Sequence, residues 1–149
     1  MTEFIMRPIG VIYSLFTEKD QTPIQSVRSQ AIGTVEVFPE FADGLKDIED
    51  FSHIHLIYIF HQSSGYSLQV KPFLDDHEHG IFATRYPYRP NPIGISTVRL
   101  LSRRENTLSI EGVDVLDGTP LLDIKPYVPD FDIRTEIVRV GWYETRSKT

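Results

Sequence analysis

With 149 residues, 40% of them hydrophobic, the chain has the size of a single domain that can bury an ordinary core. It contains no cysteine, which excludes disulfide bonds, thiolate metal sites and a cysteine nucleophile and is compatible with a reducing compartment. The net charge of −6 argues against a generic nucleic-acid binder, because phosphate contacts need a basic surface.

The N-terminal segment, residues 1–8, carries Glu3 and Arg7 and lacks the long apolar core of a signal peptide or a membrane span. We therefore expect a cytoplasmic protein with no membrane partner. The charges are segregated along the chain: every charged residue from 81 to 104 is an arginine, whereas residues 40–50 hold five carboxylates and one lysine. A basic patch can therefore exist on this acidic protein.

The first elements in chain order are predicted strands. Residues 11–16 and 31–38 mix β-branched and aromatic side chains, which is typical of strands. The polar segment between them, residues 17–30, contains a proline and is predicted to be a long loop.

A short helix is predicted over residues 40–50. Pro39 can occupy its first turn, where the missing backbone N–H is not needed. Helical spacing then brings three apolar residues to one side of the helix: Phe41, Leu45 and Ile48.

The apolar run over residues 54–60 is too short for a typical helix and predicts a central strand buried on both faces. A polar connection over 63–80 follows it. Further strand-like runs are found at residues 81–84, 94–101, 108–115, 121–128 and 137–143. Strands this frequent favour a compact barrel or sandwich over an alternating βαβ layout. We predict a mainly β protein: one small single domain over residues 1–149, built as a β-barrel or sandwich with one or two short helices.

The most specific pattern is the arginine- and proline-rich stretch at residues 82–96. Three prolines within six residues restrict the backbone and remove N–H donors, so this loop is rigid and is neither a helix nor a paired central strand. On such a platform Arg85 and Arg89 can present guanidinium groups to a carboxylate or phosphate, and Asn91 can pair with a base or amide edge. A proline-rich turn with solvated arginines explains the composition equally well.

A second candidate site lies at residues 114–120, where Asp117-Gly118 marks a tight turn between apolar runs. On its own this pattern is most simply a β-hairpin. Alternatively, Asp114 and Asp117 flank a polar ligand and accept hydrogen bonds from ribose hydroxyls or an amine.

Histidines gather around the predicted central strand. The alternation of His53, His55 and His61 is compatible with three imidazoles on one face, an arrangement that suits zinc. No further ligand completes a recognised metal motif, so we predict no metal. His61 and Gln62 follow the buried strand, where loops bind ligands, and form the stronger candidate.

The nucleotide-binding motifs of common folds do not occur in this sequence. It has no Gly-x-Gly-x-x-Gly after a strand, no Walker loop and no serine nucleophile elbow. A nucleotide-like cofactor must therefore be held in another way.

Five separated motifs resemble those of the TrmO (TsaA-like, YaeB-like) tRNA methyltransferases, over roughly residues 5 to 130. The motifs are Pro8-Ile9-Gly10-Val11-Ile12, Phe51-Ser52-His53, Phe60-His61-Gln62, residues 82–96, and Asp117-Gly118-Thr119-Pro120 followed by Pro126-Tyr127. The resemblance implies a small β-barrel that binds S-adenosylmethionine and works as a homodimer. It also implies methylation of the exocyclic N6 amine of threonylcarbamoyl-adenosine beside the tRNA anticodon.

The resemblance further implies individual site residues. The implied cofactor contacts are Gln25, His61, Gln62, Arg85, Ile95, Asp114, Val115, Leu116 and Asp117. Tyr88 and Arg89 are expected to bind RNA, and Asn91 to face the modified base as a catalytic residue.

Asp117 is expected to act in catalysis, since a carbamoylated amine is a poor nucleophile and a carboxylate can accept or orient its proton. Asp114 can instead hold the amine or ribose of the cofactor, and the sequence leaves the division of roles between the two aspartates open.

Two features depart from the family pattern. Pro23-Ile24-Gln25 stands where the family typically has Pro-Arg-Gln, and only a short segment follows Asp130, where long bacterial members carry a further domain. These departures predict altered RNA affinity or substrate choice. Two other functions stay compatible with the sequence: a non-catalytic module that binds S-adenosylmethionine or a nucleotide, and a methyltransferase with another substrate.

Overall fold

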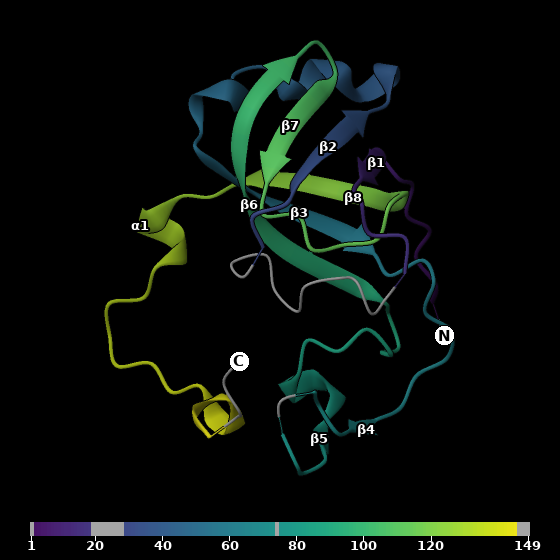
Figure 1. The fold of residues 1–149 in the computed structure, drawn as a ribbon, viewed down its shortest axis with the longest axis vertical. Helices are drawn as coiled ribbons and strands as arrows, with labels where there is room; N and C mark the ends of the chain where they lie inside the picture. The colour runs from purple at the N-terminus through teal and green to yellow at the C-terminus, as the bar shows by residue number, and fades with distance from the viewer. Residues whose placement is uncertain (1, 19–28, 74, 146–149) are drawn as a thin grey trace. The chain divides into compact units, whose positions relative to one another are not determined.

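The computed structural model describes residues 2–18, 29–73 and 75–145, which belong to two compact units (Figure 1). The barrel unit comprises Met1–His61 and Gly94–Tyr127, and the loop unit comprises Gln62–Ile93 and Val128–Thr149. The assignment of residues 1–149 to one domain stays a prediction.

Six strands close into an antiparallel barrel in the order β1-β2-β7-β6-β3-β8 (Figure 1). Their bounds are β1 (Gly10–Tyr13), β2 (Ile32–Val37), β3 (His53–Ile59), β6 (Ile93–Arg104), β7 (Thr107–Glu111) and β8 (Thr119–Pro126). Closure gives each strand a neighbour on both sides and removes free sheet edges. The predicted β-barrel with short helical segments is confirmed.

Alternating side chains of the strands fill the barrel. In β3, Ile54, Leu56 and Tyr58 are buried, while the residues between them are only half-buried. The prediction that this strand is buried on both faces is wrong, because a closed barrel has one interior and the other face of every strand lies outside it. The core also contains Ile12, Val35, Val37, Val98, Leu100, Leu108, Ile110 and Leu121.

Gly94 lies near the start of β6, where two aromatic rings approach the backbone. A Cβ at this position would lie 2.5 Å from Cε1 of Tyr58 and 2.7 Å from Cζ of Phe60. The two rings pack edge to face with their centroids 5.6 Å apart. Only glycine leaves room for this pair of rings next to the backbone of β6.

The connection between β7 and β8, residues 112–118, joins opposite sides of the barrel. β7 pairs with β2 and β6, whereas β8 pairs with β1 and β3. The β-hairpin interpretation of the Asp117-Gly118 turn is therefore wrong. Two strands that are adjacent in sequence are separated in the barrel because other strands supply their hydrogen bonds.

The predicted helix over residues 40–50 is formed by two 3-10 segments, η3 (Pro39–Leu45) and η4 (Ile48–Asp50). Pro39 opens η3, and Leu45 and Ile48 are buried as expected from their spacing. Asp47 lies between the segments with a φ of 70°, a left-handed conformation that interrupts a helix.

The loop unit contains little regular structure. β4 (Gln69–Val70) pairs with β5 (His79–Gly80), and the helical segments are single turns: η5 (Ile81–Ala83), α1 (Pro129–Asp132) and η6 (Gly141–Glu144). The strand predicted at residues 81–84 is wrong. Thr84 folds back, with its N–H and Oγ1 donating to the carbonyl of Ile81 at 3.1 and 2.9 Å, so the segment is a turn.

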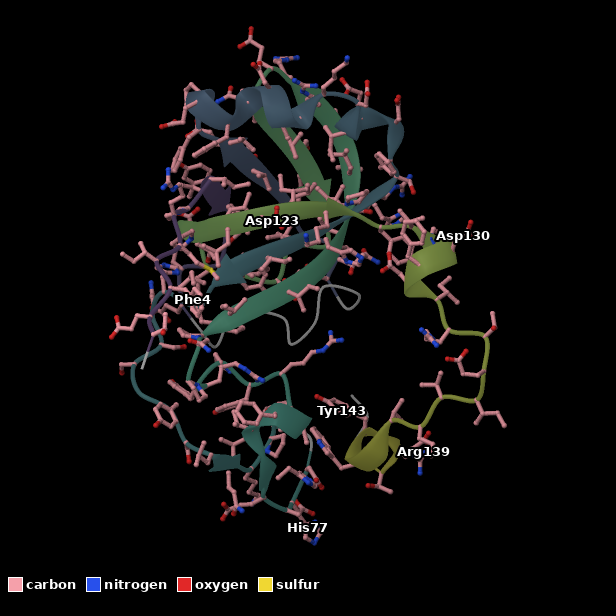
Figure 2. All side chains as sticks on the ribbon, turned by 180° about the vertical axis from the view of Figure 1, so that it is seen from behind. Phe4, His77, Asp123, Asp130, Arg139 and Tyr143 are labelled. Atoms are coloured by element: carbon pink, nitrogen blue, oxygen red, sulfur yellow. The ribbon has the colours of Figure 1, made fainter. Side chains whose placement is uncertain are left out.

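The strand predicted at residues 137–143 is also wrong. No ladder pairing occurs over these residues, and Gly141, with a φ of 59°, opens the 3-10 turn η6. The side chains between the labelled Asp130 and Arg139 project away from the backbone (Figure 2), and the apolar ones among them, such as Ile137, are exposed. Within the described ranges, no helix has the length and apolar character needed to cross a bilayer.

Candidate functional site

The predicted site residues are divided between the two units. Those of the barrel unit are His61, Ile95, Asp114, Val115, Leu116 and Asp117. Those of the loop unit are Gln62, Arg85, Tyr88, Arg89 and Asn91. Gln25 lies outside the described residues. Each unit therefore contains one part of the predicted set.

The acidic turn, residues 114–117, belongs to a connection whose carbonyl groups are held by serine side chains. Ser14, just after β1, donates from Oγ to the carbonyl of Val115 at 2.7 Å. Ser29, before β2, donates from Oγ to the carbonyl of Val113 at 2.7 Å. These bonds satisfy backbone groups that have no strand partner and make the connection rigid.

Asp114 is the buried carboxylate of the acidic turn, with only 9% of the residue exposed. Its Oδ1 accepts a hydrogen bond from Oγ of Ser96 at 2.6 Å, and Oγ of Ser96 lies 2.8 Å from the hydroxyl of Tyr58. A serine hydroxyl has a single hydrogen, which here goes to Asp114, so Tyr58 donates to Ser96. Tyr58, Ser96 and Asp114 thus form a relay of hydrogen bonds from β3 through β6 to the acidic turn.

Sequence reasoning missed Tyr58 and Ser96. A signal was present: the alternation of β6 places Ser96 inward between Gly94 and Val98, and a polar side chain at a core position needs a partner. The sequence does not identify that partner, because Asp114 lies on a connection that crosses to another side of the barrel.

Asp117 is exposed, in contrast to Asp114. Its Oδ1 accepts a hydrogen bond from the backbone N–H of Ser14 at 3.0 Å, and its own N–H donates to the carbonyl of Phe16 at 2.7 Å. Gly118 follows with a φ of 82°, which favours glycine. The turn therefore holds Asp117 at a fixed position with its carboxylate at the surface.

The remaining predicted site residues of the barrel unit differ in exposure. Val115 is buried and Leu116 is half-buried, so both help to anchor the acidic turn. Ile95, on the outer face of β6, is 46% exposed, and His61 is exposed beyond the end of β3. Ile95 and His61 are accessible to a ligand.

The arginine loop, residues 84–93, is held from within by Arg89. Nη1 of Arg89 donates to the carbonyls of Thr84 and Tyr86, both at 3.0 Å, and the residue is half-buried. The backbone carbonyl of Tyr88 accepts from the N–H of Ser67 at 3.3 Å. The rigidity expected from the prolines is thus reinforced by an internal arginine.

Other side chains of the arginine loop are presented outward. Arg85 and Asn91 are exposed, so a guanidinium group and an amide lie at the surface of the loop. Tyr86 and Tyr88 are half-buried and lie against each other, with ring centroids 5.4 Å apart and planes tilted by 52°. The loop therefore combines two packed tyrosine rings with polar side chains at its surface.

The histidines of β3 have protein partners. Nδ1 of His55 is 2.8 Å from Oγ1 of Thr97, and Nδ1 of His53 is 2.8 Å from Oγ of Ser52. Both imidazoles pack edge-on against the ring of Tyr127. In the part of the chain that the structure describes, no group of three or more histidines and carboxylates could hold a metal ion.

A surface cavity of about 580 Å³ opens on another part of the barrel unit. It is lined by Pro39, Ala42, Asp43, Lys46, Arg103, Glu105 and Asn106. None of the predicted site residues lines it, so we do not assign it to the candidate site.

These features define a class of protein: a small closed β-barrel with one buried and one exposed aspartate on a rigid turn, accompanied by a stiff loop that presents a cation and an amide. The cation of the loop suits an anionic group of a ligand, and the carboxylates of the turn suit hydroxyl or amine groups. Residues 11–133 match the model of the tRNA-methyltransferase O N-terminal domain. The chain belongs to this family, as its motifs predict.

Other proteins are similar in sequence over most of this chain. A "Probable S-adenosyl-L-methionine-binding protein" of Pyrococcus abyssi is 62% identical over 139 residues, which are 93% of this chain and 75% of that protein. An S-adenosyl-L-methionine-binding protein of Archaeoglobus fulgidus is 41% identical over 86% of this chain and 92% of its own length. The tRNA (adenine(37)-N6)-methyltransferase of Mus musculus is 35% identical over 86% of this chain, but only 32% of the mouse protein is covered.

The fold is also similar to a solved structure. The crystal structure of TrmO from Pseudomonas aeruginosa superposes with a TM-score of 0.82 at 39% sequence identity. The match covers 99% of this chain and 66% of the TrmO chain. The barrel described above is therefore the barrel of this family.

Proposed function

We propose that this chain is an S-adenosyl-L-methionine-dependent methyltransferase that modifies the N6 amine of an adenine in tRNA. The observation that carries the proposal is the family match over residues 11–133, which includes both the acidic turn and the arginine loop. The finer substrate that we propose is threonylcarbamoyl-adenosine beside the anticodon, acted on by a cytoplasmic homodimer.

The residues of the acidic turn and of the arginine loop fit the chemistry of the cofactor. S-adenosyl-L-methionine carries a carboxylate, an ammonium group, a ribose diol and an adenine. The exposed guanidinium of Arg85 suits the carboxylate, and the carboxylates of the acidic turn suit the ammonium or ribose hydroxyls. The proposed cofactor contacts are Gln25, His61, Gln62, Arg85, Ile95, Asp114, Val115, Leu116 and Asp117.

We assign different roles to the two aspartates because their surroundings differ. Asp114 is buried and already accepts from Ser96, so it suits a fixed contact to the cofactor. Asp117 is exposed and has its Oδ1 oriented by the N–H of Ser14, so its carboxylate can accept the proton of the acceptor amine.

The cofactor, when bound, supplies an electrophilic methyl group, and the remaining task of the protein is alignment and exclusion of water. In this proposal Asn91 orients the base through its amide, and Tyr88 and Arg89 contribute to RNA binding. A homodimer is supported by the exposure of several site residues, such as His61, Arg85 and Asp117, since a nucleotide-sized ligand needs further walls to be largely buried.

The test is a single-turnover methyl-transfer assay with purified chain, cofactor and tRNA, followed by mass spectrometry of the nucleosides. Asp117→Asn keeps the acceptor for Ser14 but removes the base, so the rate should fall by about 100-fold or more. Asp123→Asn, a carboxylate on β8 paired with Lys125, is the matched control and should keep the rate. Full activity of Asp117→Asn would overturn the catalytic assignment.

Cofactor binding separates the enzyme from a non-catalytic module. Isothermal titration of the wild-type chain with S-adenosyl-L-methionine should show binding that Arg85→Ala weakens by about tenfold, the loss expected for a charge-assisted contact. Binding without any methyl mark on tRNA would favour the module. A methyl mark on another nucleoside would favour a different substrate.

A further inference from the structure

The indole of Trp142, the only tryptophan of the chain, stacks on two other aromatic rings of the loop unit. Its indole lies parallel to the imidazole of His79, with centroids 4.9 Å apart and planes at 14°. On η6 itself, the ring of Tyr143 stacks on Trp142 at 4.0 Å and 25°. The stack joins the C-terminal segment to β5 within one compact unit.

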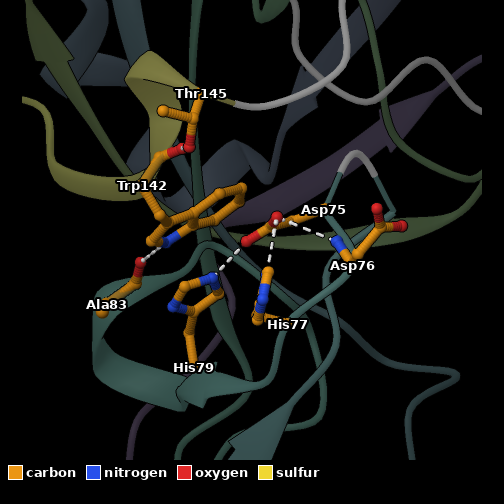
Figure 3. A network of polar contacts seen from close by, with 7 residues as sticks. All are labelled: Asp75, Asp76, His77, His79, Ala83, Trp142 and Thr145. Carbon is orange, nitrogen blue, oxygen red and sulfur yellow. Dashed lines mark hydrogen bonds and ion pairs between the residues drawn. The ribbon is translucent and has the colours of Figure 1, made fainter.

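The imidazole in this stack is itself held in place. Nε2 of His79 donates to the carboxylate of Asp75, whose other oxygen accepts from the N–H of Asp76 at 2.8 Å (Figure 3). The hydrogen bond from His79 lowers the pKa of Asp75 below its usual range. An ionised carboxylate thus orients the ring on which Trp142 rests.

Trp142 also makes a directed contact to the backbone that leads into the arginine loop. Its Nε1 donates to the carbonyl of Ala83 at 2.8 Å (Figure 3). Thr84, the next residue, is buried and closes a turn on Ile81. Arg85 follows directly after Thr84, so the indole is attached two residues before the exposed guanidinium.

Trp142 lies beyond the part of the chain that matches the family domain, which ends at residue 133. A short segment outside the matched domain therefore reaches back to the segment that carries Arg85. Packing alone would need only the ring faces, whereas the N–H bond to a loop carbonyl depends on one orientation of the indole.

We propose that Trp142 is a positioning residue, which holds residues 79–83 and thereby keeps Arg85 in the arrangement that binds the cofactor. This inference rests on the proposed function. Without the indole, the start of the arginine loop has fewer fixed contacts and spends part of its time in other arrangements. The apparent dissociation constant of the cofactor then equals the intrinsic one divided by the fraction of molecules in the binding-competent arrangement.

The experiment compares Trp142→Ala, which removes the stack and the N–H donor, with Trp142→Phe, which keeps a ring but lacks the donor. The dissociation constant of S-adenosyl-L-methionine should rise about tenfold in the first variant and about threefold in the second, as expected for competent fractions of roughly one tenth and one third. The methylation rate at saturating cofactor should stay within about twofold, because bound ligand selects the competent arrangement. Phe131→Ala, an exposed aromatic of the same segment, is the control and should change neither quantity.

Amide hydrogen exchange over residues 79–91 supplies a readout that does not depend on activity. Exchange should be faster in both Trp142 variants than in the wild type and unchanged in Phe131→Ala. Unchanged exchange and unchanged affinity in Trp142→Phe and Trp142→Ala would overturn the inference. A wild-type chain that binds no cofactor would overturn the proposed function alone, because the exchange rates still decide whether Trp142 holds the loop.

Discussion

Asp114 and Asp117 are three positions apart on one turn, yet their side chains have opposite surroundings. Asp114 is buried at the end of a hydrogen-bond relay from Tyr58 through Ser96, whereas Asp117 is exposed and oriented by a backbone N–H. A buried carboxylate needs such partners, because an unsatisfied charge in the core is costly. At the scale of single residues, this difference is the basis of the distinct roles that we propose for the two carboxylates.

The relay makes Ser96 important for stability. We expect Ser96→Ala to lower the free energy of unfolding by about 1–3 kcal/mol, because it removes a donor to buried Asp114 and an acceptor for Tyr58. Ser102→Ala on the exposed part of β6 is the matched control and should stay within about 0.5 kcal/mol of wild type. Urea denaturation measures both, and equal stability of the two variants would show that the relay contributes nothing.

At the scale of elements, the arginine loop and the start of β6 are fixed by different contacts. The loop is held by the bonds from Arg89 to its own carbonyls, whereas β6 begins where Gly94 lets the rings of Tyr58 and Phe60 approach. The loop is therefore preorganised in part by its own residues, and the start of the strand is packed against aromatic rings.

Gly94→Ala tests the packing at the start of β6. Its new Cβ would lie 2.5 Å from Tyr58, whose hydroxyl is bound to Ser96 and resists displacement. We expect a loss of about 1–3 kcal/mol in the free energy of unfolding, as is typical of overpacking. Gly44→Ala, with no atom within 4 Å of the new Cβ, should be neutral or slightly stabilising in the same denaturation experiment. A neutral Gly94→Ala would contradict the close packing.

The arginine loop should give tRNA binding a steep salt dependence, because each neutralised phosphate releases counterions. We expect Arg89→Ala to reduce the slope of log K against log salt by about 1. Arg134→Ala removes an arginine that is paired with Glu136 outside this loop and should leave the slope unchanged. Titrations with tRNA at several salt concentrations measure this slope. An unchanged slope in Arg89→Ala would show that Arg89 does not contact RNA phosphates.

At the scale of the whole molecule, the protein is acidic and its carboxylate-free stretch of arginines is the feature that suits RNA. Several predicted site residues, such as His61, Arg85 and Asp117, are exposed in the single chain, and a second subunit would supply further walls for a nucleotide-sized ligand. We expect light scattering to give the mass of a dimer at the concentrations used for activity. A monomer that is fully active at those concentrations would contradict this expectation.

Features that depend on local chemistry and on motif order can be predicted from the sequence alone. Frequent β-branched runs predict a barrel or sandwich, Pro39 predicts the start of a helical segment, and three prolines predict a stiff loop. The order of the five motifs indicates the family. These signals are readable because strand propensity, proline geometry and motif spacing act over a few residues.

The meeting of distant residues, in contrast, depends on the tertiary structure. Asp117-Gly118 predicts a hairpin because the turn looks local, but the strands on either side pair with other partners in the barrel. The partner of Asp114 is Ser96, and that of Trp142 is the carbonyl of Ala83, 59 positions away. Such contacts leave no mark in local sequence, because they are set by the closure of the barrel and by the folding of the C-terminal segment back onto its own unit.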